Sequence, residues 1–148
     1  MLPYDPALVG KYEVGTIYDD GTVKGLIFAI KADNHGDTYC YIVSLDEEDL
    51  QWSTKYEWCN CIYQRGDYNT YDPFEYYGMN INDYPAFKWC MDHGDGWFMP
   101  SSTEVNWLWE TLTNGERDFK AASVNEFNKL LKENGGEPFV ETYYWTSN

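Results

Sequence analysis

The segment at residues 94–110, GDGWFMPSSTEVNWLWE, constrains the fold of this chain more than any other part of it. Three large apolar side chains in a row predict a short buried strand at residues 97–99, and Pro100 disfavours helix at the residue before it and ends that strand. Ser101 and Glu104 have the spacing of a capping box, in which a hydroxyl and a carboxylate cap the first turn of a helix. We therefore expect the chain to pass from a central strand directly onto the helix that covers it.

Apolar side chains recur at helical spacing after that cap and in two further places. The helix that follows is expected to bury one stripe at i, i+3, i+4 and i+7, formed by Val105, Leu108, Trp109 and Leu112. A second capping box at residues 123–126 predicts another helix, which the glycine pair at 135–136 ends. A shorter helix is predicted after Asp83, with Asp83 as its N-cap and Gly94 at its end.

The other regular segments are predicted to be strands. Residues 23–30 and 38–45 are rich in β-branched and aromatic residues, and turn-forming residues separate them, which predicts a hairpin. The second arm is apolar on both faces, so we expect it to lie inside a sheet. Residues 139–148 predict a final strand, and residues 1–14 look like a lead-in. Strands followed by helices and a last strand are typical of an α+β fold rather than of alternating βαβ units.

The charge of the chain limits its partners. The formal net charge is −15, and the 10 Lys and Arg residues are spread along the sequence without a cluster. Nucleic acids and anionic membrane surfaces are bound mainly through clustered basic residues, so neither is expected as a partner. No apolar run approaches the length of a transmembrane helix, so membrane insertion is not expected either.

The best candidate for a binding site lies in a polar, aromatic stretch that runs from residue 46 to about residue 82. It shows neither a helical nor a strand period, which predicts a long irregular loop, and such loops are often functional. Rings flanked by Asn and Asp are suited to stacking on sugars or anchoring a protein partner. The predicted ligand-binding residues are Tyr63, Asp67, Tyr68, Asn69, Tyr71, Tyr76, Tyr77 and Asn80.

The cysteines leave several alternatives open. Cys59, Cys61, Cys90 and His93 include zinc-binding groups, but the usual gap between paired thiols is absent, so no metal or other cofactor is predicted. In an exported protein we expect a disulfide from Cys90 to Cys59 or Cys61, and in a cytosolic one buried thiols. Cys90 and His93 lie three residues apart on a predicted helix, as a nucleophile and its base could, but no third orienting residue is evident.

Several of these pieces, in this order, resemble an uncharacterised bacterial family of C-type-lectin-like domains that is related to the C-terminal domain of the Legionella collagen-like protein. In that family a Gly-Trp-x-Leu-Pro strand leads into a capped helix, and a later Tyr-Trp-Ser-Ser strand closes against it. Residues 96–100 match the first motif with Met99 in place of leucine, Thr103 and Glu104 match the helix start, and residues 144–147 match the second motif. The resemblance spans about residues 15–148.

The resemblance implies a single C-type-lectin-like domain over residues 1–148, with a small twisted antiparallel sheet, two or three flanking helices and long irregular loops. It gives a structural role to Trp97, Pro100, Ser101, Glu104 and Trp145, with the strands of the two tryptophans side by side. Members of the family continue for several strands past the second motif. The resemblance therefore implies that such strands lie beyond the chain or come from a neighbour.

The function implied by the resemblance is that of a non-catalytic module which binds a glycan or a protein on a bacterial surface, in a secreted protein or in a phage. A calcium-dependent sugar site is not expected, because Glu137-Pro138 is followed by Phe139 and the Trp-Asn-Asp strand of such sites is absent. Two alternatives stay open. One is an enzyme of the formylglycine-generating type that uses Cys90 and His93, and the other is a structural piece of a larger surface or phage assembly.

Overall fold

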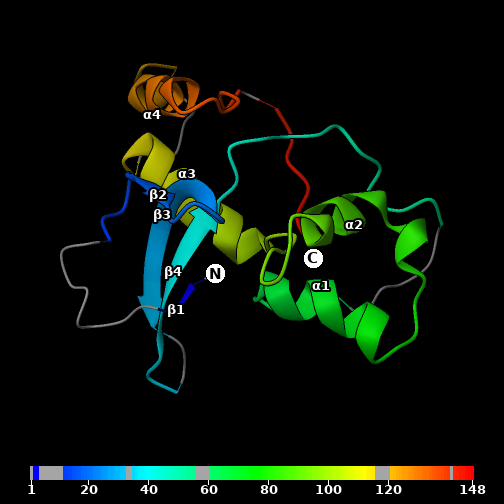
Figure 1. Ribbon diagram of the computed structural model, residues 1–148. Coiled ribbons are helices and arrows are strands. Elements are labelled where there is room, and N and C mark those ends of the chain that lie inside the picture. The colour runs from blue at the N-terminus through cyan, green and yellow to red at the C-terminus, as the bar shows by residue number, and fades with distance from the viewer. Residues whose placement is uncertain (1, 4–11, 33–34, 56–60, 116–120, 141) are drawn as a thin grey trace. The chain divides into compact units, whose positions relative to one another are not determined.

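The computed structural model describes residues 2–3, 12–32, 35–55, 61–115, 121–140 and 142–148 (Figure 1). Strands come first and helices follow, which confirms the predicted α+β class. The chain divides into two compact units, one formed by Met1–Glu47 and Trp107–Thr142 and the other by Glu48–Asn106 and Tyr143–Asn148. We call these the first and the second unit and describe each by itself.

The first unit contains a small antiparallel sheet. Its strands are β1 (Leu2–Pro3), β2 (Ile17–Asp19), β3 (Lys24–Ala32) and β4 (Thr38–Val43). The strand order is β1-β4-β3-β2, so the predicted hairpin of β3 and β4 is confirmed and β4 does lie inside the sheet. β1 pairs with β4 and falls within the predicted lead-in. A register irregularity between Ile27 and Ala29 interrupts the pairing of β3 with β4.

Helices pack on one face of this sheet. They are the second half of α3 (Ser102–Thr113) and α4 (Ala121–Glu133). The buried side chains of the first unit's helix–sheet core are Leu26, Leu112, Val124, Leu131 and Phe139. The Thr111 hydroxyl also donates a hydrogen bond to the Phe28 carbonyl at 2.7 Å, and the rings of Tyr41 and Trp107 meet edge to face at 5.3 Å.

The end of α4 was predicted correctly, but its start was not. The Gly136 amide donates to the Leu131 carbonyl at 2.8 Å, and Gly135 has a φ of +81°, which is the left-handed conformation that glycine adopts easily at a helix end. The helix begins at Ala121, so Ser123 lies inside it and the second capping box is wrong. The pattern of a capping box fits any serine followed by a glutamate three residues later, and here the backbone becomes helical two residues before that serine.

The second unit is mainly helical. Its elements are α1 (Gly66–Glu75), the short 3-10 helix η2 (Ile81–Asp83), α2 (Pro85–Asp92) and the first turn of α3. Tyr84 and Phe87 are fully buried in its core, where the rings of Trp52 and Phe74 pack against them edge to face.

The short predicted helix is confirmed as α2, but its predicted cap is wrong. Pro85 occupies the first position, and the helix ends before Gly94, whose φ is +122°. The N-cap is Tyr84 and makes no side-chain cap, because Asp83 belongs to the preceding turn of 3-10 helix.

The predicted irregular loop is wrong at residues 66–75, because these residues form α1. Its buried residues are Gly66, Asn69, Thr70 and Pro73, which have the i, i+3, i+4, i+7 spacing of a helix face. The face is therefore periodic in burial but is built from small and polar residues, and a search for apolar periodicity does not detect it.

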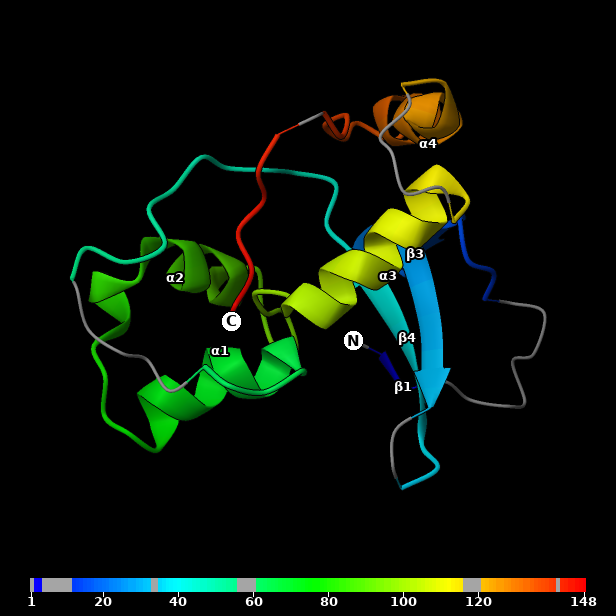
Figure 2. The ribbon, with the colours of Figure 1, turned by 180° about the vertical axis from the view of Figure 1, so that it is seen from behind.

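The two predicted tryptophan strands are also wrong. Residues 97–100 and 142–148 contain no strand, although a single backbone hydrogen bond joins them, from the Ser147 amide to the Pro100 carbonyl at 2.7 Å. Side chains of α1 take the place of a neighbouring strand. The Thr70 hydroxyl accepts from the Met99 amide at 3.0 Å, and the Tyr71 hydroxyl donates to the Trp97 carbonyl at 2.7 Å. The C-terminal segment ends beside α1 and α2 (Figure 2).

Candidate functional site

The structure separates the predicted ligand-binding residues into three groups along α1. Tyr63, Asp67 and Tyr68 lie at its N-terminal end, and Tyr76, Tyr77 and Asn80 lie at or after its C-terminal end. Asn69 and Tyr71 have their polar groups engaged within the second unit. A helix of ten residues is about 15 Å long, so the two ends are separate surfaces.

Asn69 is fully buried and organises the segment before α1. Its side-chain oxygen accepts from the Tyr63 amide at 2.9 Å, and its side-chain nitrogen donates to the Tyr63 carbonyl at 2.8 Å and to the Ser147 hydroxyl at 3.0 Å. The amide group thus pairs with Tyr63 as a neighbouring strand would. Tyr71 is also engaged within the unit. Its hydroxyl donates a hydrogen bond to the Trp97 carbonyl, and burial raises its pKa above the ordinary value.

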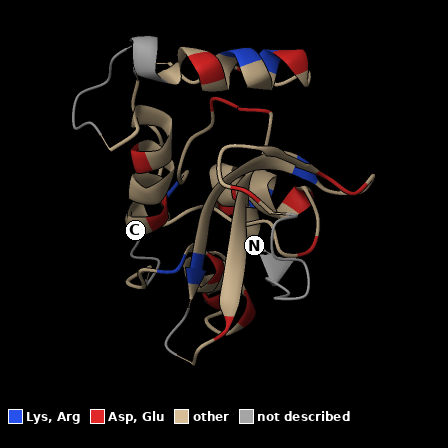
Figure 3. Ribbon diagram, turned by 90° about the vertical axis from the view of Figure 1, so that its left-hand side faces the viewer, with Lys and Arg blue, Asp and Glu red and all other residues tan. Residues whose placement is uncertain are grey.

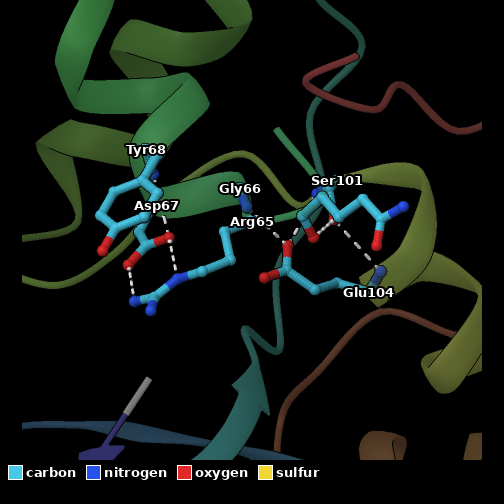
Figure 4. A network of polar contacts seen from close by, with 7 residues as sticks. Arg65, Gly66, Asp67, Tyr68, Ser101 and Glu104 are labelled. Carbon is cyan, nitrogen blue, oxygen red and sulfur yellow. Dashed lines mark hydrogen bonds and ion pairs between the residues drawn. The ribbon is translucent and has the colours of Figure 1, made fainter. Parts of the chain in front are cut away.

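The N-terminal end of α1 carries a compact aromatic and charged cluster. The rings of Tyr63 and Tyr68 meet edge to face at 5.7 Å, and the guanidinium of Arg65 lies 4.4 Å from the centre of the Tyr68 ring. Arg65 Nε also donates to Asp67 Oδ1 at 3.0 Å (Figure 4). Arg65 and Asp67, which flank Gly66 in the sequence, are therefore paired with each other.

Glu104 holds the N-terminal end of α1 by a hydrogen bond. Its Oε2 accepts from the Ser101 amide at 2.7 Å and from the Gly66 amide at 3.0 Å (Figure 4). The Glu104 amide in turn donates to the Ser101 hydroxyl at 3.3 Å, so the predicted capping box of α3 is confirmed. One carboxylate oxygen thus holds the first turns of both α1 and α3, a second role that the sequence pattern does not reveal.

The environment of Glu104 favours its protonated form. The side chain is 1% exposed, and burial raises its pKa above the ordinary value, although the two amide hydrogen bonds act in the opposite direction. The nearby carboxylate of Asp67 also raises the pKa of Glu104.

The C-terminal end of α1 exposes two neighbouring rings. Tyr76 is 77% exposed and Tyr77 is 59% exposed. Among the described residues, neither ring has an aromatic contact, and neither hydroxyl has a hydrogen bond. Asn80 is exposed after them and its side-chain oxygen accepts from the Asn82 amide at 3.1 Å, which starts η2. This end of the helix therefore presents apolar surface that the fold does not use.

The C-terminal segment was predicted as a strand but is anchored as an extended tail. The indole N–H of Trp52 donates to the Thr146 carbonyl at 2.8 Å, and the indole N–H of Trp145 donates to the Leu50 carbonyl at 2.9 Å. The Asn148 side chain accepts from the Ser102 amide at 2.8 Å. Trp145 is nevertheless 58% exposed. Trp52 and Asn148 are structural residues that sequence reasoning missed.

The cysteines do not form the disulfide that was considered for Cys90. Cys40 and Cys90 carry thiols, whereas Cys61 is disulfide-bonded, and Cys59 lies outside the described residues. His93 Nδ1 lies 2.8 Å from the Trp89 carbonyl, and its ring packs on the Trp89 ring at 4.3 Å. Within the described ranges, no group of three or more His, Cys, Asp and Glu side chains is arranged to hold a metal ion.

Comparison of this chain with known families, with characterised proteins and with solved structures finds no match. Among the helices that the structure describes, none combines the length and the apolar character needed to cross a bilayer.

Proposed function

We propose that this chain is a non-catalytic module that binds a glycan or a protein through exposed aromatic residues of its second unit. The observation that carries the proposal is the exposure of Tyr76 and Tyr77, 77% and 59%, at consecutive positions after the last residue of α1. Tyrosine offers a large contact area at a small cost in side-chain entropy, which is why it is frequent in binding surfaces. The Tyr63–Tyr68 pair at the other end of α1 is the second candidate surface.

The scaffold that presents these rings is well fixed. Hydrogen bonds and packing hold the buried face of α1. Glu104 accepts a hydrogen bond from the amide of Gly66, the first residue of the helix, and Thr70 accepts one from the Met99 amide in the segment before α3. Phe74 packs against the aromatic core. Binding residues are commonly placed at the ends of such rigid elements, where side chains are exposed while the backbone does not move. Two exposed rings on this rigid support are suited to contacts with a ligand that depend on stacking more than on hydrogen bonds.

A surface or secreted location belongs to the same proposal. Disulfides persist in oxidising compartments, so the disulfide at Cys61 supports a location outside the cytosol. The expectation that nucleic acids are not partners rests on the net charge of −15.

Replacing Tyr76 and Tyr77 together with alanine tests the proposed function. We expect binding in a glycan array or a panel of surface proteins to weaken at least about tenfold, because tyrosines that a ligand covers on binding are frequent hot spots. The free energy of unfolding should change by less than about 0.5 kcal/mol, because both rings lie outside the core. Tyr143→Ala, which removes a fully exposed ring elsewhere in the second unit, is the matched control and should bind like the unmodified chain.

The non-catalytic part of the proposal is tested at Cys90. Its thiol packs at the edge of the aromatic core of the second unit, beside residues such as Phe87. We expect Cys90→Ala to retain ligand binding within about twofold, because the side chain is replaced by a small apolar one on a partly buried helix face. Loss of a measurable turnover in Cys90→Ala and in His93→Gln, with folding intact, would instead support the enzyme of the formylglycine-generating type.

A further inference from the structure

We infer that the C-terminal end of α1, formed by Asp72, Glu75, Tyr76 and Tyr77, docks a cationic segment of a partner protein, rich in arginine or lysine. This inference rests on the proposed function and specifies its ligand. The four residues are called the tyrosine end below.

The two carboxylates of the tyrosine end lie where the dipole of α1 makes negative charge unfavourable. The C-terminus of a helix bears partial negative charge, so basic residues stabilise its last turn and acidic residues destabilise it. The last turn of α1 contains no basic residue, and Asp72 and Glu75 lie in or next to it. Their placement is unfavourable for the helix dipole, which favours a role in an interaction with another molecule.

The lysines and the arginine of the second unit pair with other carboxylates, not with Asp72 or Glu75. Its only lysines and arginine are Lys55, Arg65 and Lys88. Each of them already forms an ion pair with an aspartate, namely Asp83, Asp67 and Asp92 respectively. Among the described residues, Asp72 and Glu75 have no ion pair. Acidic positions outnumber basic ones along the ribbon as a whole (Figure 3). The surface is therefore complementary to a cation and would repel an anionic ligand.

The opposite end of α1 shows how such a cation would be held. There the guanidinium of Arg65 lies over the Tyr68 ring at 4.4 Å and pairs with the carboxylate of Asp67 (Figure 4). Cations are attracted to the faces of aromatic rings, and a carboxylate beside the ring adds a charge-assisted hydrogen bond. The tyrosine end supplies the same two components, exposed rings and carboxylates, without an internal arginine. An arginine or a lysine of a partner would complete the arrangement.

The test uses the full chain and a short synthetic peptide in which arginine alternates with serine. Matched peptides carry glutamine or glutamate in place of arginine. Binding is measured in salt of about 0.15 M, where the Debye length is about 8 Å and distant charges are screened. We expect Asp72→Asn/Glu75→Gln to weaken binding of the arginine peptide at least about tenfold. The matched control Glu48→Gln/Asp49→Asn removes the same charge at two exposed sites of the same unit and should change binding less than about twofold.

The inference is overturned if the arginine peptide does not bind, if the glutamine or glutamate peptide binds equally well, or if both double variants weaken binding to the same extent. The proposed function can survive that result. It does so if Tyr76→Ala/Tyr77→Ala loses binding to a neutral glycan or another protein while Asp72→Asn/Glu75→Gln binds that ligand normally. If neither variant pair affects any ligand, both the inference and the proposed function fail.

Discussion

Replacing Glu104 with alanine is expected to lower the free energy of unfolding by about 3–5 kcal/mol, because two buried amides lose their acceptor and the capping box is broken. The Ser101 and Gly66 amides both donate to Glu104 Oε2, at 2.7 and 3.0 Å, and the side chain is 1% exposed. An unsatisfied buried donor costs about 1–3 kcal/mol, and the removed side chain also leaves a cavity.

The measurement is amide hydrogen exchange combined with urea unfolding. Protection should fall at the first residues of α1 and α3 before it falls elsewhere, since those are the amides that Glu104 holds. A Glu104→Ala variant that unfolds within about 1 kcal/mol of the unmodified chain would show that the carboxylate is not a support of the two helix ends.

Glu104→Gln is the matched control and separates shape from charge. Glutamine keeps an oxygen that can accept from both amides, so we expect it to cost clearly less than alanine. Burial raises the folded-state pKa of Glu104 above its ordinary value of 4.5, so the folded protein binds this proton more tightly than the unfolded chain does. The stability associated with the proton is present below the unfolded-state pKa and is lost as the pH rises through the folded-state pKa.

The difference in stability between Glu104→Gln and the unmodified protein should therefore change with pH. Glutamine cannot ionise, so relative to it the unmodified protein should lose stability as the pH rises from about 4 towards neutrality. A difference that does not depend on pH, or one that changes in the opposite direction, would contradict the assigned environment of Glu104.

Local patterns predicted the parts of the fold that local interactions determine. The hairpin of β3 and β4, the cap of α3 and the glycine end of α4 each depend on a few neighbouring residues, and all were found as expected. The second serine pattern, at Ser123, failed because α4 is already helical from Ala121, two residues before that serine. A capping pattern thus indicates where a helix can begin, and the rest of the chain decides whether it does.

The segments that could not be predicted are those whose partners are distant in sequence. Asn69 and Thr70 are fully buried because their side chains bond to Tyr63, Ser147 and Met99, and none of these pairings leaves a signal near α1. Residues 97–99 have strand-forming composition, but the hydroxyls of α1 satisfy their backbone and no strand is formed. A search for hydrophobic periodicity does not detect buried polar residues of this kind.

The sequence singled out the residues of the candidate site but did not predict how they are arranged. The sequence located the aromatic segment, and the structure keeps Tyr76 and Tyr77 at its surface. It removes Asn69 from solvent, and it adds Arg65 to the rings at the other end of the helix. An interpretation as an irregular loop treats all of these residues as equivalent, whereas a helix assigns each of them to an end or to a face.

Replacing Gly66 with alanine is expected to destabilise the second unit by about 3 kcal/mol or more, because the added methyl group has no room. A Cβ atom at this position would lie 2.4 Å from the Met99 carbonyl oxygen, 2.6 Å from Glu104 Oε2 and 2.7 Å from Phe98 Cδ2. Glu104 Oε2 cannot move without breaking its hydrogen bonds to two amides, and the Met99 carbonyl belongs to a backbone segment whose amide is bonded to Thr70. The same change in an open helix would stabilise by about 0.5–1 kcal/mol, so the expected result has the opposite sign to helix propensity.

Gly78→Ala is the control for this prediction. Gly78 has a φ of +65° and no atom within 4 Å of the added Cβ, so alanine there should cost only the conformational penalty of about 1 kcal/mol. Urea unfolding of both variants, followed by tryptophan fluorescence, measures the difference. If Gly66→Ala were no less stable than Gly78→Ala, α1 could not approach Glu104 and Met99 as closely as the structure shows. The packing that holds the N-terminal end of α1, and with it the rigid support of the surface proposed for binding, would then be wrong.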